Sequence, residues 1–284
     1  MRYERNCSEL TAKRYETSLR DFEAFFLTTD EWLTWASVDA DIIRRWMESL
    51  MDRGNIASTV NTAMSALRSF FRFAKARSLV QSNPTTGLRA PKKSKPLPQF
   101  VREEQMNRLI DEPESSDDIN IVRARTIIIL LYEAGLRRAE LTNLNDTDVD
   151  FAAMQLKVNG KRDKQRIVPF GEELAKQLRQ YIEIRNEQLP RNSEALMVDN
   201  KGNRMTGMQV YRLVKSELGK ATTQKKRSPH VLRHSFATAL LNNGASLEGV
   251  RQLLGHESAA TTQIYTHTTF EQLKRVYKKA HPRG

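Results

Sequence analysis

Apolar side chains recur every three or four residues in three successive stretches near the start of the chain. This spacing predicts three amphipathic helices, with Asp39 as the N-cap of the second and Ser58 as the N-cap of the third. We therefore expect a helical domain over residues 1–88, and we assign most of its aromatic side chains to the core rather than to stacking on bases. The apolar positions include Leu19, Phe22, Phe26, Ile42, Ile43, Trp46, Leu50, Val60, Met64, Leu67 and Phe71.

The composition changes at residues 89–98, which read RAPKKSKPLP. This segment holds three prolines and no acidic residue, and its cations are Arg89, Lys92, Lys93 and Lys95. Proline disfavours helix at its own position and at the residue before it, so the segment is predicted to be an extended linker. A basic linker of this kind either follows a phosphate backbone or remains a solvated tether, and the sequence does not separate the two.

Residues 99–284 mix helical and β-prone patterns. Residues 154–158 and 166–168 flank the polar segment NGKRDKQ, which predicts a hairpin, and residues 195–198 are predicted to add a third strand. The expected fold class is therefore mainly α with a small antiparallel β-sheet, divided into two domains. Helices are predicted over residues 103–110, 121–134, 172–187, 208–218, 229–242, 247–254 and 269–280.

The chain carries a formal net charge of +12 at pH 7 over 284 residues. A chain this basic is typical of proteins that bind a polyanion, nucleic acid first among them, although a merely basic surface gives the same number. Its single cysteine, Cys7, excludes a disulfide framework and fits a reducing compartment. The amino-terminal residues MRYERNCSEL are no signal peptide, and the longest apolar run, residues 126–132, is too short to span a bilayer. We therefore expect a cytoplasmic protein with no membrane segment.

All five histidines lie in the last fifth of the chain, and two of them are spaced as metal ligands can be. His230 and His234 are four residues apart and would share one face of a helix. Arg233 lies between them, and a cation is a poor neighbour for a divalent metal. We therefore do not assign a metal site to this pair.

Three alternating aspartates, Asp146, Asp148 and Asp150, superficially resemble a calcium-binding loop. Phe151 and Lys157 stand where such a loop needs glycine and glutamate, so a solvated entry to a strand is the better interpretation. The sequence also lacks the glycine-rich phosphate loop of nucleotide hydrolases.

The remaining candidates are cations, histidines and one tyrosine, which together fit attack on a phosphodiester. Such attack concentrates negative charge on the non-bridging oxygens, and two arginines can clamp that charge. The leaving 5′ oxygen needs a proton, which a lysine or a histidine can supply. A tyrosine can act as a covalent nucleophile that conserves the bond energy for rejoining, provided that its setting is positively charged. The set has no carboxylate pair, which argues against two-metal cleavage. Its members are Arg137, Lys161, His230, Arg233, His256 and Tyr265.

Five motifs in the second half of the chain occur together and in order: GLRRAEL, GKRDKQRIVPF, HVLRHSFAT, LLGHESAATTQIYTH and the terminal HPRG. STVNTAMSALRSFFRF and PKKSKPLP precede them. With these motifs the chain resembles the tyrosine site-specific recombinases, most of all the bacterial Xer branch, over roughly residues 8–284.

The resemblance implies a role for each candidate at the scissile phosphate. Arg137 and Arg233 would clamp the phosphate, and Lys161 would donate a proton to the leaving 5′ oxygen. His230 and His256 would hydrogen-bond the phosphate and assist proton movement.

The same resemblance implies that Tyr265 forms the 3′-phosphotyrosine bond. Glu140 would orient the site, whereas His234 and His267 would be structural. It implies neither a cofactor nor a metal ion, so we expect metal-independent strand breakage and rejoining.

The family architecture implies a helical, SAM-like core-binding domain over residues 1–88, a linker over residues 89–98 and a catalytic domain over residues 99–284. The two domains would clamp double-stranded DNA at a short core site, with no further arm-binding domain. Four protomers, all of this chain or shared with a related recombinase, would exchange strands through a Holliday junction.

The Xer branch implies resolution of chromosome or plasmid dimers, a task tied to chromosome partition and cell division, with a DNA translocase of the division machinery as a further partner. An integrase or invertase of a mobile element would use the same chemistry. A type IB topoisomerase shares it too, but the Xer-like helical domain at the amino terminus favours a recombinase.

A DNA-binding relative that had lost catalysis would have an eroded site, and every matched position here is occupied.

Overall fold

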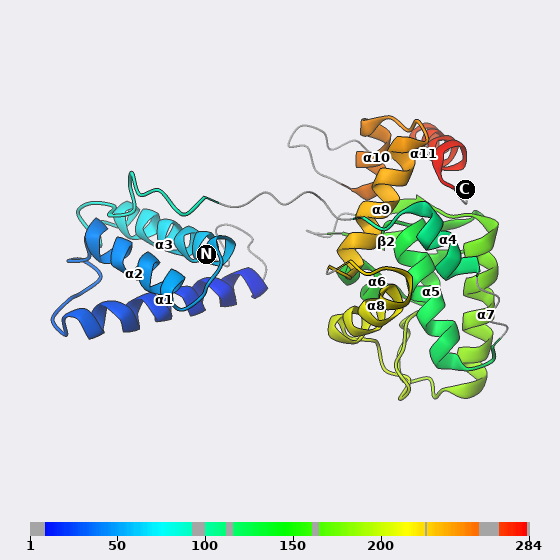
Figure 1. Cartoon of the computed structure of the whole chain (residues 1–284), viewed down its shortest axis with the longest axis horizontal. Coiled ribbons are helices and arrows are strands. Elements are labelled where there is room, and N and C mark those ends of the chain that lie inside the picture. The colour runs from blue at the N-terminus through cyan, green and yellow to red at the C-terminus, as the bar shows by residue number, and fades with distance from the viewer. Residues whose placement is uncertain are drawn as a thin grey trace. The chain divides into compact units, whose positions relative to one another are not determined.

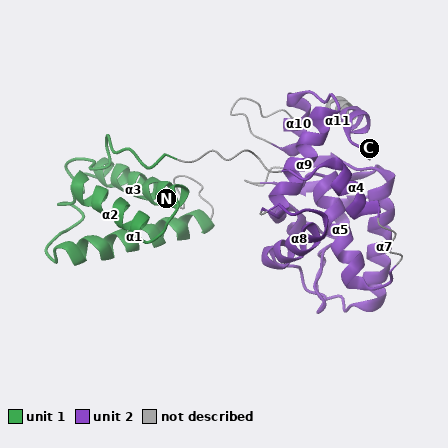
Figure 2. Cartoon of the chain, in the orientation of Figure 1, with its two compact units in different colours: residues 1–97 green, residues 98–284 purple. Residues whose placement is uncertain are grey.

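The structure is a computed structural model, and it divides the chain into two compact units, Met1–Leu97 and Pro98–Gly284 (Figure 2). We describe each unit by itself. The described residues are 9–92, 100–111, 116–160, 165–224, 226–255 and 267–282, with side chains from residue 274 onward in the last range.

The first unit contains the three predicted helices, α1 (Glu9–Thr29), α2 (Ala40–Asp52) and α3 (Ala57–Ala76) (Figure 1). Asp39 is confirmed as the N-cap of α2, because its side chain accepts hydrogen bonds from the backbone N–H groups of the first turn. The prediction that Ser58 caps α3 is wrong. The helix begins one residue earlier, at Ala57, and it has no side-chain cap.

The core of the first unit is aromatic, as the pattern predicts. Phe22, Phe26, Trp46 and Phe71 are fully buried, and the rings of Phe22 and Trp46 meet edge to face at 5.0 Å. Aromatic pairs in this geometry add to the gain from burial alone. These rings are therefore part of the packing of the unit.

The end of the first unit is held along α3 by two side chains. Asn61 donates a hydrogen bond to the carbonyl of Pro91 at 2.8 Å, and Arg68 donates one to the carbonyl of Leu88 at 2.7 Å. The residues that enter the predicted linker are thus fastened to α3 up to Pro91.

The second unit contains all seven of the helices predicted for it, and α6 in addition. The apolar run at residues 126–132 is wholly buried in α5, and α7, α8 and α9 pack around this helix (Figure 1). The helices are α4 (Glu103–Asp111), α5 (Ile119–Glu133), α6 (Arg138–Asn143), α7 (Glu172–Gln188), α8 (Gly207–Ala221), α9 (Pro229–Asn242), α10 (Leu247–Leu254) and α11 (His267–Ala280), with a short 3-10 helix η1 (Asp146–Asp148).

A three-stranded antiparallel sheet accompanies these helices, in the order β1 (Val149–Asp150), β2 (Gln155–Asn159) and β3 (Gln165–Pro169). The pairing of β2 with β3 confirms the predicted hairpin, with Leu156 opposite Val168. The mainly helical fold with a small antiparallel sheet is therefore as expected.

The predicted third strand over residues 195–198 is wrong. Ala195 and Val198 form only isolated bridges, and the third strand of the sheet is β1 instead. The apolar segment is buried without a ladder, and the carbonyls of Ala195 and Leu196 accept hydrogen bonds from the Arg185 side chain.

A smaller hydrophobic cluster joins α9, α10 and α11 at one end of the second unit (Figure 1). Phe236 and Leu240 of α9 meet Leu253 of α10 and Tyr277 of α11 in this cluster. The carboxyl-terminal helix therefore packs on its own unit. None of the helices that the structure describes has the length and hydropathy needed to cross a membrane.

Candidate active site

The site is built where α5 ends and α6 begins, at a glycine in the left-handed backbone region. Gly135 has φ +57°, and a Cβ atom at this position would lie 2.5 Å from the ring of Phe236. Only glycine adopts this conformation without strain and leaves room for the ring. The turn buries Leu136 and places Arg137 at the N-cap of α6.

Glu140, in the first turn of α6, is the centre of the site. Its side chain is 4% exposed and accepts a hydrogen bond from the backbone N–H of Arg137 at 2.7 Å. The Arg137 side chain also donates to Oε1 of Glu140 at 2.6 Å. Glu140 thus fixes both the backbone and the side chain of the first arginine.

Two further arginines reach the same carboxylate from other elements. Arg166 on β3 donates to both of its oxygens, with Nη1–Oε1 at 2.7 Å and Nη2–Oε2 at 2.8 Å. Arg233 on α9 approaches Oε2 to 3.6 Å. One carboxylate and three guanidinium groups leave two positive charges in excess, which favours binding of an anion.

The surroundings of Glu140 keep it ionised. Burial raises its pKa, but the hydrogen bonds and charge of Arg166, together with the hydrogen bonds from Arg137, outweigh burial and lower the pKa of Glu140 to about 2. Burial and the charge of Arg137 lower the pKa of Arg233 to about 9, so this arginine remains largely protonated at neutral pH.

The three arginines also bind the last carbonyls of α10. Arg166 Nε lies 3.1 Å from the carbonyl oxygen of Leu253, Arg233 Nη2 lies 2.5 Å from that of Leu254, and Arg137 Nη2 lies 3.2 Å from that of Gly255. Carbonyls at a helix end lack partners within the helix and carry partial negative charge, so guanidinium groups stabilise them. The end of α10 is therefore held directly beside Glu140.

His230 lies in the first turn of α9, three residues before Arg233, and so on a neighbouring position of the same helix face. Partial burial lowers its pKa, and the charges of Arg138, His234, Arg233 and Arg137 lower it further. A neutral imidazole at pH 7 follows. It can donate a hydrogen bond from one nitrogen and accept at the other.

The structure brings three of the six predicted site residues, Arg137, His230 and Arg233, to one place beside Glu140. The other three, Lys161, His256 and Tyr265, lie outside the described residues.

The segments that carry these three residues adjoin described elements. His256 follows Gly255 at the end of α10, and Tyr265 precedes α11 by two residues. Lys161 follows Gly160, just after β2.

Arg166 is the residue that sequence reasoning missed. It lies inside the motif GKRDKQRIVPF, and its side chain is 5% exposed on the same buried face of β3 as Val168. An arginine at an inward position of a strand needs a buried carboxylate partner. The alternation of inward and outward positions along the strand, which places Arg166 inward with Val168, is the signal that could have singled it out.

The three alternating aspartates have separate structural partners, and do not form a loop around an ion. Asp146 pairs with Arg185 at 2.8 Å, Asp148 accepts from the backbone of Asn145, and Asp150 accepts from the backbone of the turn that follows. Within the described part of the chain, no three histidine, cysteine or acidic side chains gather as metal ligands would.

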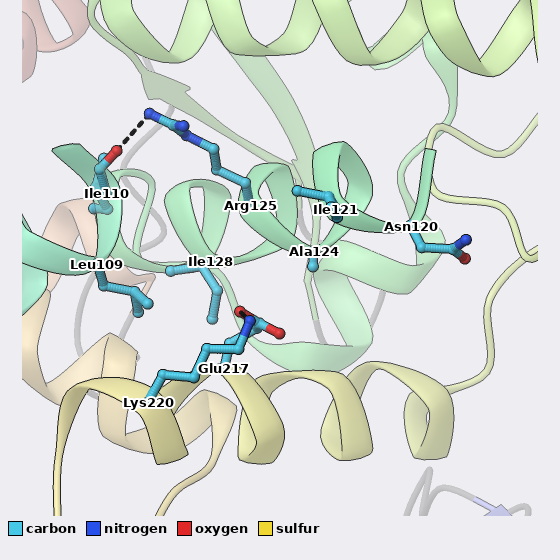
Figure 3. A pocket seen from close by; sticks show the side chains of 9 residues that line it. All are labelled: Leu109, Ile110, Asn120, Ile121, Ala124, Arg125, Ile128, Glu217 and Lys220. Atoms are coloured by element: carbon cyan, nitrogen blue, oxygen red, sulfur yellow. Dashed lines mark hydrogen bonds and ion pairs between the residues drawn. The ribbon is translucent and has the colours of Figure 1, made fainter. Parts of the chain in front are cut away.

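A pocket of about 290 Å³ lies between α4, α5 and α8 (Figure 3). Its walls are a mixture of apolar and polar side chains, and the ion pair of Glu217 with Lys220 borders it from α8. Arg125 turns out of the pocket to donate to the carbonyl of Ile110 at 2.5 Å. None of the arginines that bind Glu140 lines this pocket, so we assign it no part in the chemistry.

Comparison with known proteins identifies the family. Residues 99–272 match the phage integrase family, and residues 1–78 match the SAM-like amino-terminal domain of phage integrases. The chain belongs to the phage integrase family, as a Xer-like tyrosine recombinase. A tyrosine recombinase XerC of Chlorobaculum tepidum is 35% identical to it over 306 residues, which cover 99% of this recombinase and 91% of the relative. A tyrosine recombinase XerC of Vibrio campbellii is 37% identical over 284 residues, covering 100% and 90%.

Solved structures of the family share the fold of this recombinase. The XerA recombinase matches with a TM-score of 0.52 and 29% identity, covering 98% of this chain and 94% of that one. The XerH recombinase bound to its difH substrate after cleavage matches with a TM-score of 0.71 and 24% identity, covering 95% and 80%.

Proposed function

We propose that this recombinase breaks and rejoins DNA at a short core site, with Arg137 and Arg233 holding the scissile phosphate. The observation that carries this proposal is the excess of two positive charges around Glu140, to which these two arginines contribute. Guanidinium groups suit the oxygens of a phosphodiester because they donate paired, charge-assisted hydrogen bonds. The neutral His230 beside them would add a hydrogen bond to the phosphate without adding charge.

In the cleavage step, the Tyr265 hydroxyl oxygen attacks phosphorus and the bond from phosphorus to the 5′ oxygen breaks. The tyrosine becomes a 3′-phosphotyrosine, and the leaving 5′ oxygen takes a proton from Lys161. The proton that the Tyr265 hydroxyl loses passes to a neutral histidine, and His230 and His256 are the proposed acceptors. Rejoining reverses the step, because a 5′ hydroxyl from the partner strand attacks the phosphotyrosine and releases Tyr265.

Double-stranded DNA is the substrate, and the biological reaction that we propose is Xer-type resolution of chromosome or plasmid dimers in the cytoplasm. The XerC relatives are 33–37% identical over nearly the whole chain, which supports this process over integration of a mobile element. The Tn1549 transposon integrase and the λ integrase are 17–22% identical, and their likeness shows the fold alone. In this proposal four protomers, all of this chain or shared with a related recombinase, assemble on the DNA. A DNA translocase of the division machinery is a further partner.

Covalent trapping tests the proposed function. In cells grown with the tagged recombinase, protein–DNA adducts recovered under denaturing conditions should map to one short sequence near the replication terminus or on plasmids. A nicked duplex that carries this sequence should then trap the adduct in vitro, and EDTA should leave the yield unchanged, since the proposed groups are cations and a tyrosine. Loss of cleavage in EDTA that magnesium alone restores would contradict this chemistry.

The carboxyl-terminal helix is the element that we propose to link neighbouring protomers. In the structure it packs on its own unit, where Tyr277 and Ala280 are buried and Asn243 donates to the carbonyl of Ala280 at 3.0 Å. His281 stacks on Tyr277 with ring centroids 4.7 Å apart. A neighbour's helix of the same sequence would fit the same surface, so protomers in a ring can exchange this helix head to tail.

Truncation after Thr269 should therefore spare DNA binding by a monomer but weaken cooperative binding and recombination. Gel shifts at one and at two binding sites measure the two effects separately, and thermal unfolding verifies that the truncated chain is folded. Replacing Lys278 and Lys279 with alanine is the matched control, because both are exposed and the apolar side of the helix remains. Normal assembly and recombination by a folded, truncated chain would restrict the helix to packing on its own unit.

A further inference from the structure

We propose that Arg166 is a positioning residue for recombination, which locks Glu140 and the end of α10 so that Arg137 and Arg233 are free to bind the phosphate. This inference rests on the proposed function, because it takes the phosphate as the ligand of those two arginines. It adds a residue that the sequence motifs leave without a role.

Arg166 joins three elements at one point. It extends from β3, its two Nη atoms bind both oxygens of Glu140 on α6, and its Nε binds the carbonyl of Leu253 on α10. The pair with Glu140 is buried on both sides, at 5% and 4% exposure. A fork of two parallel hydrogen bonds fixes the orientation of the carboxylate as well as its position.

Arg137 and Arg233 hold the end of α10 through N–H groups that could instead donate to a phosphate. Arg137 and Arg233 each place one Nη atom on a carbonyl of that end, at Gly255 and at Leu254. If both turn these donors to a phosphate, two of the three side-chain hydrogen bonds described for this helix end are lost. The contact of Arg166 with Leu253 then remains, and it keeps in place the segment that leads to His256.

Gly255 shows how closely Arg166 is fitted to the helix end. The residue has φ +62°, and a Cβ atom there would lie 3.0 Å from Cδ and 3.4 Å from Nε of Arg166. Glycine therefore serves twice, by adopting the left-handed conformation that ends α10 and by admitting the arginine.

The charges that face Glu140 predict how loss of Arg166 would appear in a pH profile. They come from Arg137 at the start of α6, Arg166 on β3 and Arg233 on α9. Without Arg166 the carboxylate of Glu140 loses two hydrogen bonds and a positive charge but remains buried. The pKa of Glu140 therefore rises. As pH falls, a protonated Glu140 no longer accepts from both groups of Arg137, and the phosphate clamp loosens.

The test compares Arg166→Met, Arg166→Lys and a control, Arg185→Met, in single-turnover cleavage of the trapped site on a nicked duplex from pH 5 to pH 8. Arg185 is a matched control because it is also buried, also pairs with a carboxylate through both Nη atoms at 2.8 and 2.9 Å, and also binds backbone carbonyls. It lies away from Glu140 and binds Asp146 instead. Thermal unfolding and DNA gel shifts of all three variants report on folding and binding.

We expect Arg166→Met to cleave about 10²-fold more slowly at pH 8, the scale on which small misplacements of catalytic groups act, and to slow further toward pH 5. Arg166→Lys keeps a charge beside Glu140 but not the fork, so its rate should fall without the added dependence on pH. Arg185→Met should lose thermal stability while the folded fraction cleaves with the rate and pH profile of the wild type. In a Glu140→Gln background, Arg166→Met should no longer alter the pH profile.

Two outcomes would overturn parts of this picture, and they can be told apart. If the wild type forms no adduct, the proposed function fails whatever Arg166 does. If the wild type cleaves but Arg166→Met matches Arg185→Met in both rate and pH profile, the role of Arg166 is structural and the inference fails.

Discussion

Replacing Tyr265 with phenylalanine is expected to abolish the covalent DNA adduct altogether while DNA binding persists. The substitution removes one oxygen atom and keeps the ring, so the positive groups that bind DNA are unchanged. The charge cluster at Glu140 would still hold the phosphate through Arg137 and Arg233. Without the phenolic oxygen no bond to phosphorus can form, and the strand stays intact.

Denaturing gels of a labelled, nicked duplex measure the adduct, and native gel shifts measure binding. Tyr211→Phe is a suitable control, since Tyr211 is a half-buried tyrosine on α8 with no assigned role, and its adduct yield should equal that of the wild type. An adduct that survives denaturation in the Tyr265→Phe protein would assign the nucleophile to another residue.

The sequence predicts most of the fold because long amphipathic stretches have few alternatives. Trp46 and Phe22 recur at helical spacing with their neighbours, and each is fully buried. The start of α9 at Pro229 and the end of α10 at Leu254 coincide with the predicted bounds. Proline at the first turn and glycine after the last turn mark those ends physically.

Short segments are where sequence reasoning fails, because tertiary contacts outweigh local preference there. Residues 195–198 are apolar and β-prone, yet they form only isolated bridges, and the carbonyls of Ala195 and Leu196 accept from the Arg185 side chain. β1 has only two residues, Val149 and Asp150, too few to leave a pattern. Pairing with β2 forms it.

The sequence predicts which residues belong to the candidate site better than it predicts the contacts between them. Arg137, His230 and Arg233 stand in motifs, and the ends of α5, α6 and α9 bring them together. Two of the three arginines that converge on Glu140, Arg166 and Arg233, lie 26 or more residues from it along the chain. Spacing along a chain carries no information about such contacts, which is why the part of Arg166 emerges only from the structure.

Lys161→Ala is expected to slow cleavage by about 10²- to 10⁴-fold, the usual scale for the loss of a general acid. The two arginines that we propose to bind the phosphate, Arg137 and Arg233, carry charge but are poor proton donors, even with the pKa of Arg233 at about 9. His230, whose pKa is lowered by burial and by nearby cations, is neutral at pH 7 and a weak acid there. The described groups therefore leave the leaving 5′ oxygen without an efficient acid, and the lysine of the NGKRDKQ hairpin would supply it.

A leaving group that needs no proton separates this role from simple anchoring of the phosphate. A 5′-bridging sulfur departs as a thiolate, so Lys161→Ala should cleave the sulfur-substituted duplex at nearly the wild-type rate. Lys164→Ala is the matched control from the same hairpin, and it should cleave both the oxygen and the sulfur duplex as the wild type does. If sulfur does not rescue Lys161→Ala, Lys161 only binds the phosphate. The proton must then come from another group, and His256 is the first to be tested.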